Sequence, residues 1–193
     1  MAARVKIPKK ERFCKMENDI LKVLITEQQL AEKVQALGKQ ISEDYKDKNL
    51  TLVSVLKGSV VFMADLMRAI TIPCYVDFMS VSSYGSGIKT SGAVKIIKDL
   101  DIDLSNRDLL IVEDILDSGM TLNYITKILK QRGTKSIKIC TLLDKPARRA
   151  VDLTADYSGF CVPDEFVVGY GLDYDEEYRN LPYVGVLKPH VYE

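Results

Sequence analysis

The sequence has few of the residues on which metal sites and disulfide frameworks depend. It contains one histidine, His190, and four scattered cysteines, Cys14, Cys74, Cys140 and Cys161. Because there is no CxxC pair and no histidine at ligand spacing, neither a zinc site nor a disulfide framework is expected. Reduced thiols in the cytoplasm are the better interpretation, and we regard His190, so near the terminus, as incidental.

Long hydrophobic runs and an excess of one charge are also absent. No stretch approaches the roughly 18–20 apolar residues of a membrane span, and no signal-peptide segment opens the chain. With 27 Lys and Arg against 27 Asp and Glu, the formal net charge is zero. The chain as a whole therefore does not attract DNA or an anionic membrane, and any polyanion must bind at a local site. The lack of a GxxxxGKS or GxxxxGKT stretch makes a phosphate-binding kinase remote.

What is present fits one soluble domain. The 193 residues are 47% hydrophobic and 28% charged, which is ordinary for a globular protein large enough to bury a core. Residues 1–15, MAARVKIPKKERFCK, are basic and lack apolar periodicity. We expect a flexible, non-essential arm there and the domain proper in residues 16–193. The alternatives are a tail that touches nucleic acid, or a real start at Met16.

Apolar patterns predict strands that alternate with helices. Thr26 and Gln29 have capping-box spacing, and apolar residues at helical spacing follow, so we expect an amphipathic helix that ends near Tyr45. The remaining predictions are helices over 60–69 and 121–131, and strands over 50–56, 74–81, 94–98, 108–112, 136–143, 166–170 and 184–187. Buried strands that alternate with helices indicate an α/β fold whose parallel sheet is covered on both faces.

Three polar segments directly follow predicted strands: Lys57-Gly58, Glu113 to Thr121, and Lys145. Ligands collect beyond the carboxyl ends of the strands in parallel sheets, so we expect these segments to converge on one rim. Residues 84–92, YGSGIKTSG, are rich in Gly, Ser and Thr and are expected to form a mobile loop.

The turn after the 108–112 strand suits a phosphate. It joins a buried strand to a helix, so the free N–H groups of the first helical turn point at the rim. Small side chains and hydroxyls let an anion approach the backbone. The residues of this turn are Asp117, Ser118, Gly119, Met120 and Thr121. The alternative is that Asp117 or Ser118 simply caps the helix.

An acid pair, Glu113 and Asp114, precedes this turn and should repel phosphate. An ionised carboxylate only accepts hydrogen bonds, so it suits hydroxyl groups, a divalent cation or a proton to be removed. A ribose 5-phosphate would satisfy both halves of the segment, with its phosphate on the turn and its 2- and 3-hydroxyls on the acids. The alternative for the acid pair is solvation of a loop.

The segment VEDILDSGMT, residues 112–121, resembles the phosphoribosyl-pyrophosphate signature of the type I phosphoribosyltransferases. The resemblance extends along nearly the whole chain after Met16, and it is to the members that act on 6-oxopurines. It rests on five motifs in order: SVLKGS (54–59), SSYGS (82–86), VEDILDSG (112–119), LLDKP (142–146) and VPDEFVVGYGLDYDEEYRNL (162–181).

This resemblance implies a fold and a reaction. The fold is α/β, with a central, mainly parallel sheet flanked by helices, a small hood and a flexible active-site loop. The reaction is purine salvage, in which the phosphoribosyl group passes from phosphoribosyl pyrophosphate to N9 of hypoxanthine or guanine, giving IMP or GMP and pyrophosphate, with Mg²⁺ as cofactor. The resemblance also implies a cytoplasmic homodimer or homotetramer, with no nucleic-acid or membrane partner.

The resemblance assigns the ribose and metal contacts to the acid pair and the turn. Asp117 would be the catalytic base that takes or shares the N7 proton of the purine. The implied ribose 5-phosphate contacts are Glu113, Asp114, Asp117, Ser118, Gly119, Met120 and Thr121. The implied Mg²⁺ ligands are Glu113, Asp114 and Asp173.

The implied pyrophosphate contacts are Lys57, Gly58 and Arg179. Arginine suits pyrophosphate because its planar fork binds two oxygens at once. Family members hold the bond before this lysine in the cis form, which is Leu56–Lys57 here. Ser83 and Tyr84 open the loop that resembles the family's closing lid. A lid is reasonable because water could attack the same cationic centre.

The implied purine contacts are Lys145, Phe166, Val167 and Asp173. Lys145 would donate to the 6-oxo group. Because an ammonium has donors only, a 6-amino group would find no acceptor there, and hypoxanthine and guanine should be preferred over adenine. Phe166 would stack on the purine, and the backbone of Val167 would contact its edge. Without the resemblance, Lys145 would be assigned to the solvated surface and Phe166 to the core.

One position departs from the family pattern, and two rival functions remain. Met120 stands where other members can carry lysine, so one positive charge is lost but the backbone N–H groups remain. The main rival is a regulator of the same fold that senses phosphoribosyl pyrophosphate or nucleotides and binds nucleic acid, supported only by the basic arm. The second is a sibling transferase that acts on xanthine or another base.

Overall fold

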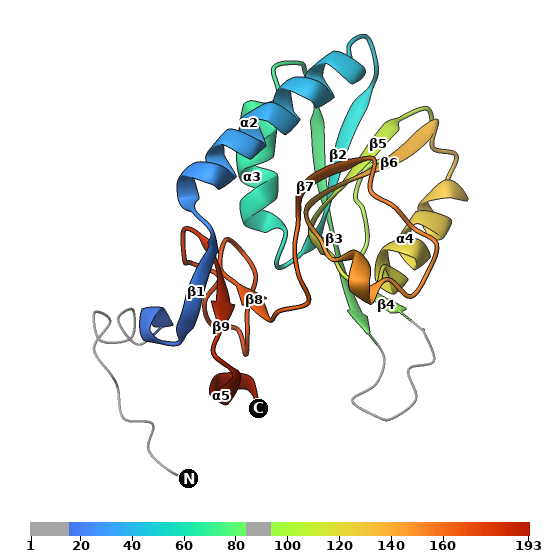
Figure 1. Ribbon diagram of the computed structural model, residues 1–193. Helices are drawn as coiled ribbons and strands as arrows, with labels where there is room; N and C mark the ends of the chain where they lie inside the picture. The colour runs from blue at the N-terminus through green and yellow to red at the C-terminus, as the bar shows by residue number, and fades with distance from the viewer. Residues whose placement is uncertain (1–15, 84–93) are drawn as a thin grey trace, which may run out of the picture.

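The computed structural model describes residues 16–83 and 94–193. Within these residues the centre of the protein is a mixed sheet of six strands (Figure 1). Its neighbouring strands are parallel except for the edge pair formed by residues 94–98 and 75–83. In spatial order the strands are β4 (Val94–Lys98), β3 (Tyr75–Ser83), β2 (Leu50–Leu56), β5 (Asp108–Leu116), β6 (Ser136–Asp144) and β7 (Tyr157–Cys161).

The inner strands are apolar along most of their length because both faces of the sheet are covered. Leu52 of β2 packs in a core cluster with α2 (Glu27–Asp44) and α3 (Val60–Ala69). Its neighbour Val53 points to the other face, into a cluster shared with α4 (Met120–Lys130). Figure 1 shows α2 and α3 on one side of the sheet and α4 on the other. The predicted parallel sheet with two covered faces is therefore confirmed, apart from the antiparallel edge.

The first long helix begins at the predicted capping box. Thr26 Oγ1 accepts a hydrogen bond from the Gln29 amide at 3.3 Å, and Gln29 Oε1 accepts one from the Thr26 amide at 2.9 Å. The apolar positions at helical spacing are buried, and the helix ends with Tyr45 as its C-cap. Both predicted ends of this helix are confirmed.

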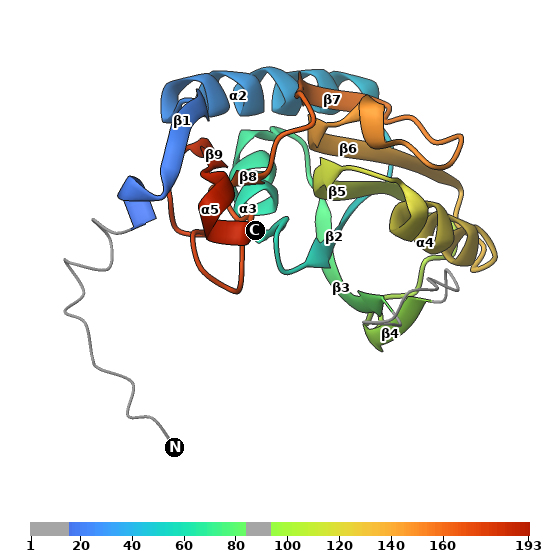
Figure 2. The same ribbon diagram turned by 60° about the horizontal axis from the view of Figure 1, so that its bottom comes forward.

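A second, antiparallel sheet lies beside the first. It consists, in order, of β1 (Ile20–Ile25), β9 (Val184–Leu187) and β8 (Val167–Val168). We call this sheet, together with residues 169–183, the hood. The short helix α5 (Pro189–Tyr192) ends the chain next to it, as Figures 1 and 2 show from two directions.

Several element predictions are corrected by the structure. The strands β1 and β7 were not predicted: β1, ILKVLI, is an apolar run interrupted by Lys22 directly before the capping box, and β7, YSGFC, is a short edge strand without apolar alternation. The expected 166–170 strand is only two residues long, and residues 169–171 turn away from it. The 108–112 strand continues to Leu116, so the acid pair belongs to the end of β5 rather than to a loop after it.

Two predictions concern segments outside the described residues. The basic arm, residues 1–15, and the lid residue Tyr84 both lie there, and Ser83 is the last residue of β3. In the described part of the chain, no helix combines the length and the apolar character that crossing a bilayer requires.

Candidate active site

A pocket of about 280 Å³ lies at the carboxyl ends of β2 and β5. Its lining comes from three places in the sequence: the end of β2 with the two residues after it, Val81 of β3, and the continuous segment that joins the end of β5 to the start of α4. The lining residues are Val55, Leu56, Lys57, Gly58, Val81, Glu113, Asp114, Ile115, Leu116, Asp117, Ser118, Gly119, Thr121 and Leu122. The predicted convergence of the Lys57-Gly58 segment with the acid pair and the turn is confirmed.

The turn leaves the start of α4 open. Gly119 is the N-cap, with a left-handed backbone at φ +77°, and among the described residues no side chain caps the helix there. Ser118 Oγ accepts only a long hydrogen bond, 3.4 Å, from the Met120 amide. The alternative in which Asp117 caps the helix is therefore wrong. The positive end of α4 faces the pocket, as an anion site requires.

Asp117 lies at the edge of this turn and is held through its backbone. Arg149 donates to the carbonyl oxygens of Leu116 at 3.1 Å and Asp117 at 2.7 Å, and the Ala150 amide donates to Ser118 O at 3.0 Å. The Asp117 carboxylate has a weak contact with Arg148 at 3.4 Å, and its Oδ1 has no hydrogen-bond partner among the described residues.

Sequence reasoning missed Arg149, because no motif assigned a role to it. The available signal was its place just after β6, next to Lys145 and close to the predicted rim.

The acid pair is costly in the ligand-free protein. Burial, and then the charge of Asp114, raise the pKa of Glu113 well above its usual range. Its Oε2 has neither solvent contact nor a hydrogen-bond partner among the described residues. Burial raises the pKa of Asp114 from 3.8 to about 6, although the Ile115 amide, which donates to its Oδ1 at 2.8 Å, opposes the rise. Both groups therefore favour a cation or a donor as partner.

Two glycines allow the pieces of the site to touch. A Cβ at Gly58 would lie 1.8 Å from Asp114 Oδ2, and a Cβ at Gly171 would lie 2.1 Å from the carbonyl oxygen of Gly58. Gly171 also has φ +102°, which other residues rarely adopt. The Leu56–Lys57 peptide bond is cis, as the resemblance implied. The Lys57-Gly58 segment and the hood are thus in direct backbone contact.

The hood brings one arginine and two acids to the same place. Arg179 donates to Gly171 O at 2.9 Å and forms ion pairs with Asp173 at 2.9 Å and Glu176 at 3.3 Å. Lys57 pairs with Glu176 at 3.0 Å. The charges of Arg179 and Asp173 also act on Asp114, the first lowering its pKa and the second raising it. The predicted pyrophosphate residues Lys57, Gly58 and Arg179 therefore lie close together.

The predicted purine residues form a neighbouring group rather than part of the pocket lining. Lys145 is buried, with 4% of its surface exposed, and its Nζ donates to Glu165 O at 2.9 Å. Its amide donates to Leu116 O at 3.0 Å, which ties it to the end of β5. Phe166 follows Glu165 and is 37% exposed, and Val167 is buried in β8. The assignment of Lys145 to the solvated surface is therefore wrong.

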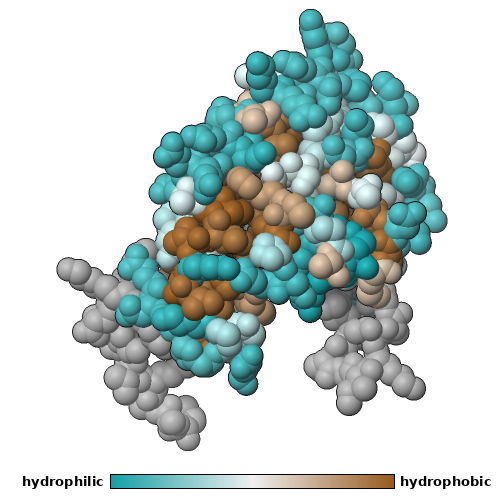
Figure 3. All heavy atoms as spheres, viewed as in Figure 1, coloured by the Kyte–Doolittle hydropathy of each residue, from teal (hydrophilic) through white to brown (hydrophobic). Residues whose placement is uncertain are grey.

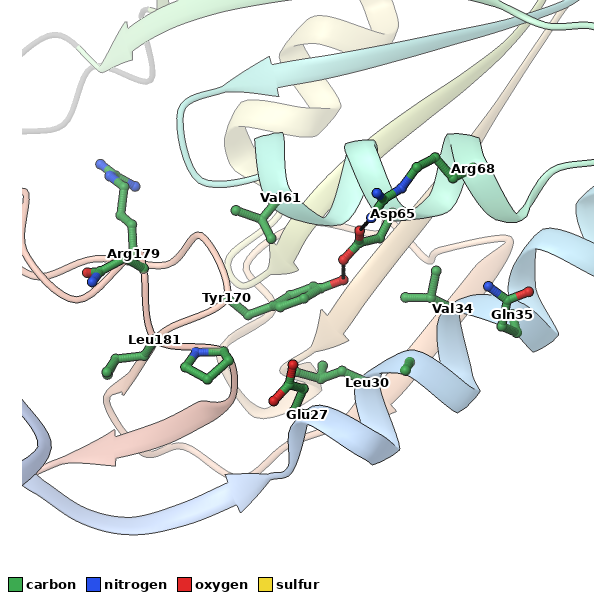
Figure 4. A pocket seen from close by; sticks show the side chains of 13 residues that line it. Glu27, Leu30, Val34, Gln35, Val61, Asp65, Arg68, Tyr170, Arg179 and Leu181 are labelled. Atoms are coloured by element: carbon green, nitrogen blue, oxygen red, sulfur yellow. Dashed lines mark hydrogen bonds and ion pairs between the residues drawn. The ribbon is translucent and has the colours of Figure 1, made fainter.

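A larger cavity, about 640 Å³, lies between α2, α3 and the hood (Figure 4). The hydroxyl of Tyr170 donates to Asp65 there, and Asp65 forms an ion pair with Arg68. Of the predicted site residues only Arg179 lines it. We place the chemistry in the smaller pocket, because that is where the acid pair, the helix start and Gly58 meet.

The acids suit a hard divalent cation only in combination with ligand oxygens. In the described ranges, 16–83 and 94–193, no group of three or more His, Cys, Asp or Glu side chains could hold a metal by itself. Mg²⁺ is usually bound by one or two carboxylates together with substrate phosphates and water. The unpartnered oxygen of Glu113 and the adjacent Asp114 fit that mode.

Comparisons with known proteins agree with this geometry. The family description "Phosphoribosyl transferase domain" matches residues 24–175. The hypoxanthine-guanine phosphoribosyltransferase of Bacillus subtilis is 56% identical over 178 residues, which is 92% of this chain and 99% of that protein. The bifunctional protein TilS/HprT of Listeria monocytogenes is 55% identical over 177 residues, and the chain spans 27% of its length. A hypoxanthine phosphoribosyltransferase structure from Staphylococcus aureus, 52% identical, superposes with a TM-score of 0.90 over 93% of this chain and 97% of that one.

Proposed function

The chain belongs to the phosphoribosyl transferase domain family, and from this premise we propose that the protein salvages 6-oxopurines. It transfers the phosphoribosyl group of phosphoribosyl pyrophosphate to N9 of hypoxanthine or guanine, releasing pyrophosphate. Relatives named hypoxanthine-guanine phosphoribosyltransferase are 52–56% identical over most of the chain. The observation that carries the proposal is the meeting of Gly58, the acid pair and the open start of α4 in one pocket.

The sugar phosphate uses both halves of the β5–α4 segment. The 5-phosphate accepts hydrogen bonds from the first-turn amides and from the hydroxyls of Ser118 and Thr121. The 2- and 3-hydroxyls donate to Glu113 and Asp114. Met120, 40% exposed, contributes its amide rather than a charge.

The leaving pyrophosphate is bound by two cationic side chains, Lys57 and Arg179, which lie near the pocket in the ligand-free protein. Lys57 and Arg179 exchange their carboxylate partners for phosphate oxygens, and the Arg179 fork binds two of them. The close approach of Gly58 lets the loop lie against the diphosphate. When bound, Mg²⁺ supplies positive charge to the pyrophosphate, and Glu113, Asp114 and Asp173 are the residues that would hold it.

The purine is recognised by Lys145, Phe166 and Val167. The Lys145 ammonium has one donor on Glu165 O, and another is available for the 6-oxo group of the base. Phe166 stacks on the ring, and the Val167 backbone contacts its edge, with Asp173 nearby on the hood. A 6-amino group would meet only donors, so adenine is rejected.

Asp117 moves the proton. The N9–C1′ bond forms as the bond from C1′ to the pyrophosphate oxygen breaks, and the ribose carbon acquires oxocarbenium character. Asp117 takes or shares the N7 proton, which makes N9 nucleophilic. Support for this role comes from its Oδ1, which has no hydrogen-bond partner in the described part of the chain, and from the two hydrogen bonds by which Arg149 holds the backbone of Leu116 and Asp117. A well-placed base contributes about 10²–10⁴-fold.

Assembly, location and closure are also part of the proposal. Exposed apolar side chains of β1, Leu21 at 55% and Val23 at 49%, support a homodimer or homotetramer. Figure 3 shows hydrophobic residues gathered over the hood side of the molecule. The free thiols of Cys74, Cys140 and Cys161 support a cytoplasmic location. A lid that begins at Ser83 and Tyr84 excludes water.

One assay tests the proposed function. The purified protein is mixed with phosphoribosyl pyrophosphate, Mg²⁺ and, in turn, hypoxanthine, guanine, xanthine and adenine, and pyrophosphate release is measured. We expect hypoxanthine and guanine to react and adenine to be slower by roughly 10⁴-fold or more. Reactions without a purine serve as the control for hydrolysis. Release with adenine at the same rate, or with none of the four bases, would refute the proposal.

A further inference from the structure

Two other aromatic rings pack against the ring of Phe166. Tyr192, from the C-terminal helix α5, stacks on Phe166 with ring centroids 4.8 Å apart and planes 19° from parallel. Tyr174 lies nearly perpendicular to Phe166 in a T-shaped contact, with centroids 5.5 Å apart and an interplanar angle of 88°. Aromatic pairs in these two geometries are favourable beyond the area that they bury. One face of Phe166 is therefore stacked on Tyr192, and the Tyr174 ring stands perpendicular to it.

The position of Tyr192 is fixed by the packing of α5 on the hood. Val191 and Tyr192 contact a buried cluster formed by Val168, Tyr178, Leu181 and Leu187. The segment is also tied to the N-terminal side of β1, because the Lys188 amide donates to Asp19 O at 2.9 Å. Figures 1 and 2 both place α5 against β8 and β9. Tyr192 is thus held by the same sheet that contains β8, the strand that directly follows Phe166.

Part of the Phe166 side chain remains open to a ligand. Phe166 is 37% exposed even with Tyr192 and Tyr174 in contact. Its backbone is fixed on both sides: Leu187 N donates to Phe166 O at 2.8 Å, and Lys145 Nζ donates to the preceding carbonyl at 2.9 Å. The backbone alone does not set the plane of the ring, since the side-chain torsions remain free to rotate. The rings of Tyr192 and Tyr174 restrict that plane, and Tyr192 is the one that lies nearly parallel to it.

We infer that Tyr192 is a positioning residue for the purine, acting through Phe166. It holds the Phe166 ring in the orientation in which a base stacks on the face opposite Tyr192, so that the ring loses little freedom when the base binds. The base, Phe166 and Tyr192 then form a stack of three rings. This inference rests on the proposed function, and it assigns a binding role to the last turn of the chain, outside the matched family segment 24–175.

Three variants of the full-length protein test this inference. In Tyr192→Ala the stacking partner is lost, and we expect the KM for hypoxanthine and guanine to rise about 2- to 12-fold, the range that corresponds to one aromatic pair. The KM for phosphoribosyl pyrophosphate should stay unchanged. Tyr192→Phe keeps the ring and should restore the wild-type values. Val191→Ala is the matched control, because Val191 anchors the same helix and lies outside the Phe166 stack.

The outcomes separate the possible roles of Tyr192. If Tyr192→Ala and Val191→Ala raise the purine KM equally, or if both substrates are affected alike, α5 has only a structural role and the inference is wrong. A lower purine KM in Tyr192→Ala would also overturn it, because Tyr192 would then occupy the face that the base needs. A wild-type protein that makes no nucleotide refutes the proposed function itself, and this inference with it. Melting curves of each variant exclude a general loss of folding as the cause.

Discussion

Replacing Asp114 by asparagine should stabilise the ligand-free protein at neutral and alkaline pH while weakening substrate binding. Asp114, near the end of β5, is 9% exposed, and its carboxylate packs against the backbone of Gly58. Burial is the main cause of its raised pKa. Asparagine has nearly the same shape and keeps an oxygen for the Ile115 amide, which donates to Asp114 Oδ1 at 2.8 Å. The exchange therefore removes mainly the negative charge.

The sign and size of the effect follow from the pKa of Asp114, about 6 in the folded protein against 3.8 ordinarily. The folded state binds this proton more tightly than the unfolded state does. The contribution of Asp114 to the free energy of unfolding is therefore most favourable below about pH 4, and it falls as the pH rises to about 6. One pKa unit corresponds to about 1.4 kcal/mol, so the charged carboxylate costs the folded state about 3 kcal/mol at high pH. At about pH 4.5 the cost is only about 1 kcal/mol.

The assay is urea-induced unfolding of the wild type and Asp114→Asn at two pH values, without substrate or metal. We expect the variant to gain about 2 kcal/mol more relative to the wild type at about pH 8 than at about pH 4.5. Asp152→Asn, an exposed aspartate after β6, is the control and should change stability by less than about 0.5 kcal/mol at both. The affinity for phosphoribosyl pyrophosphate with Mg²⁺, measured by calorimetry, should fall in Asp114→Asn and stay unchanged in Asp152→Asn.

Two results would refute this reasoning. A stability difference that does not depend on pH would mean that the carboxylate has no raised pKa in the folded protein. Unchanged affinity for phosphoribosyl pyrophosphate and Mg²⁺ would mean that the charge of Asp114 has no role in binding them. A stabilising change that removes activity is the pattern expected when a site stores an unfavourable charge for its ligand.

Three further predictions concern other parts of the site. Asp117→Asn should lower turnover by about 10²–10⁴-fold and leave the affinity for phosphoribosyl pyrophosphate nearly unchanged; an equal loss of both would contradict a role as base. Lys145→Ala should reduce the preference for hypoxanthine over adenine, measured as a ratio of kcat/KM values, and an unchanged ratio would place Lys145 outside the base site. Excess chelator should reduce pyrophosphate release to near background, and full activity without divalent metal would contradict the proposed leaving-group chemistry.

The long elements of the fold could be predicted because local signals and tertiary packing agree. The capping box at Thr26 and the continuous apolar runs of β2, β5 and β6 each have one stable interpretation. The strand β7 could not be predicted in the same way, whereas β1, ILKVLI, was missed although five of its six residues are apolar. The sequence of β7, YSGFC, contains a glycine and no alternation, and it is a strand because β6 offers it a free edge.

The segments that form the site could be predicted from the sequence, whereas the contacts that hold these segments together could not. The rule that ligands collect at the carboxyl ends of parallel strands was enough to bring Lys57-Gly58 and the β5–α4 turn together. The Arg149 clamp depends on how the chain returns after η1 (Pro146–Arg148), which no local pattern encodes. The contact of Gly171 with Gly58 joins residues more than 100 positions apart, and a glycine in a loop is usually explained by its local turn.

The charges of the ligand-free site are arranged for exchange with a ligand. Lys57 and Arg179 already have carboxylate partners, Glu176 and Asp173, on the hood. The Lys57–Glu176 pair is exposed, with 66% and 63% of the two side chains accessible, so replacing it by phosphate oxygens costs little. Among the described residues Glu113 and Asp114 form no ion pair with a cationic side chain, and burial raises the pKa of both.

A ligand that brings phosphates together with a divalent cation changes the partners of the two cationic side chains and of the two buried acids at the same time. Its phosphates replace the hood acids on Lys57 and Arg179, and its cation offsets the negative charge of Glu113 and Asp114. Neither an anion alone nor a metal alone would do both. We therefore expect the diphosphate and the metal to bind together more tightly than either binds alone, and we expect this coupling to weaken below about pH 6, where Asp114 gains its proton.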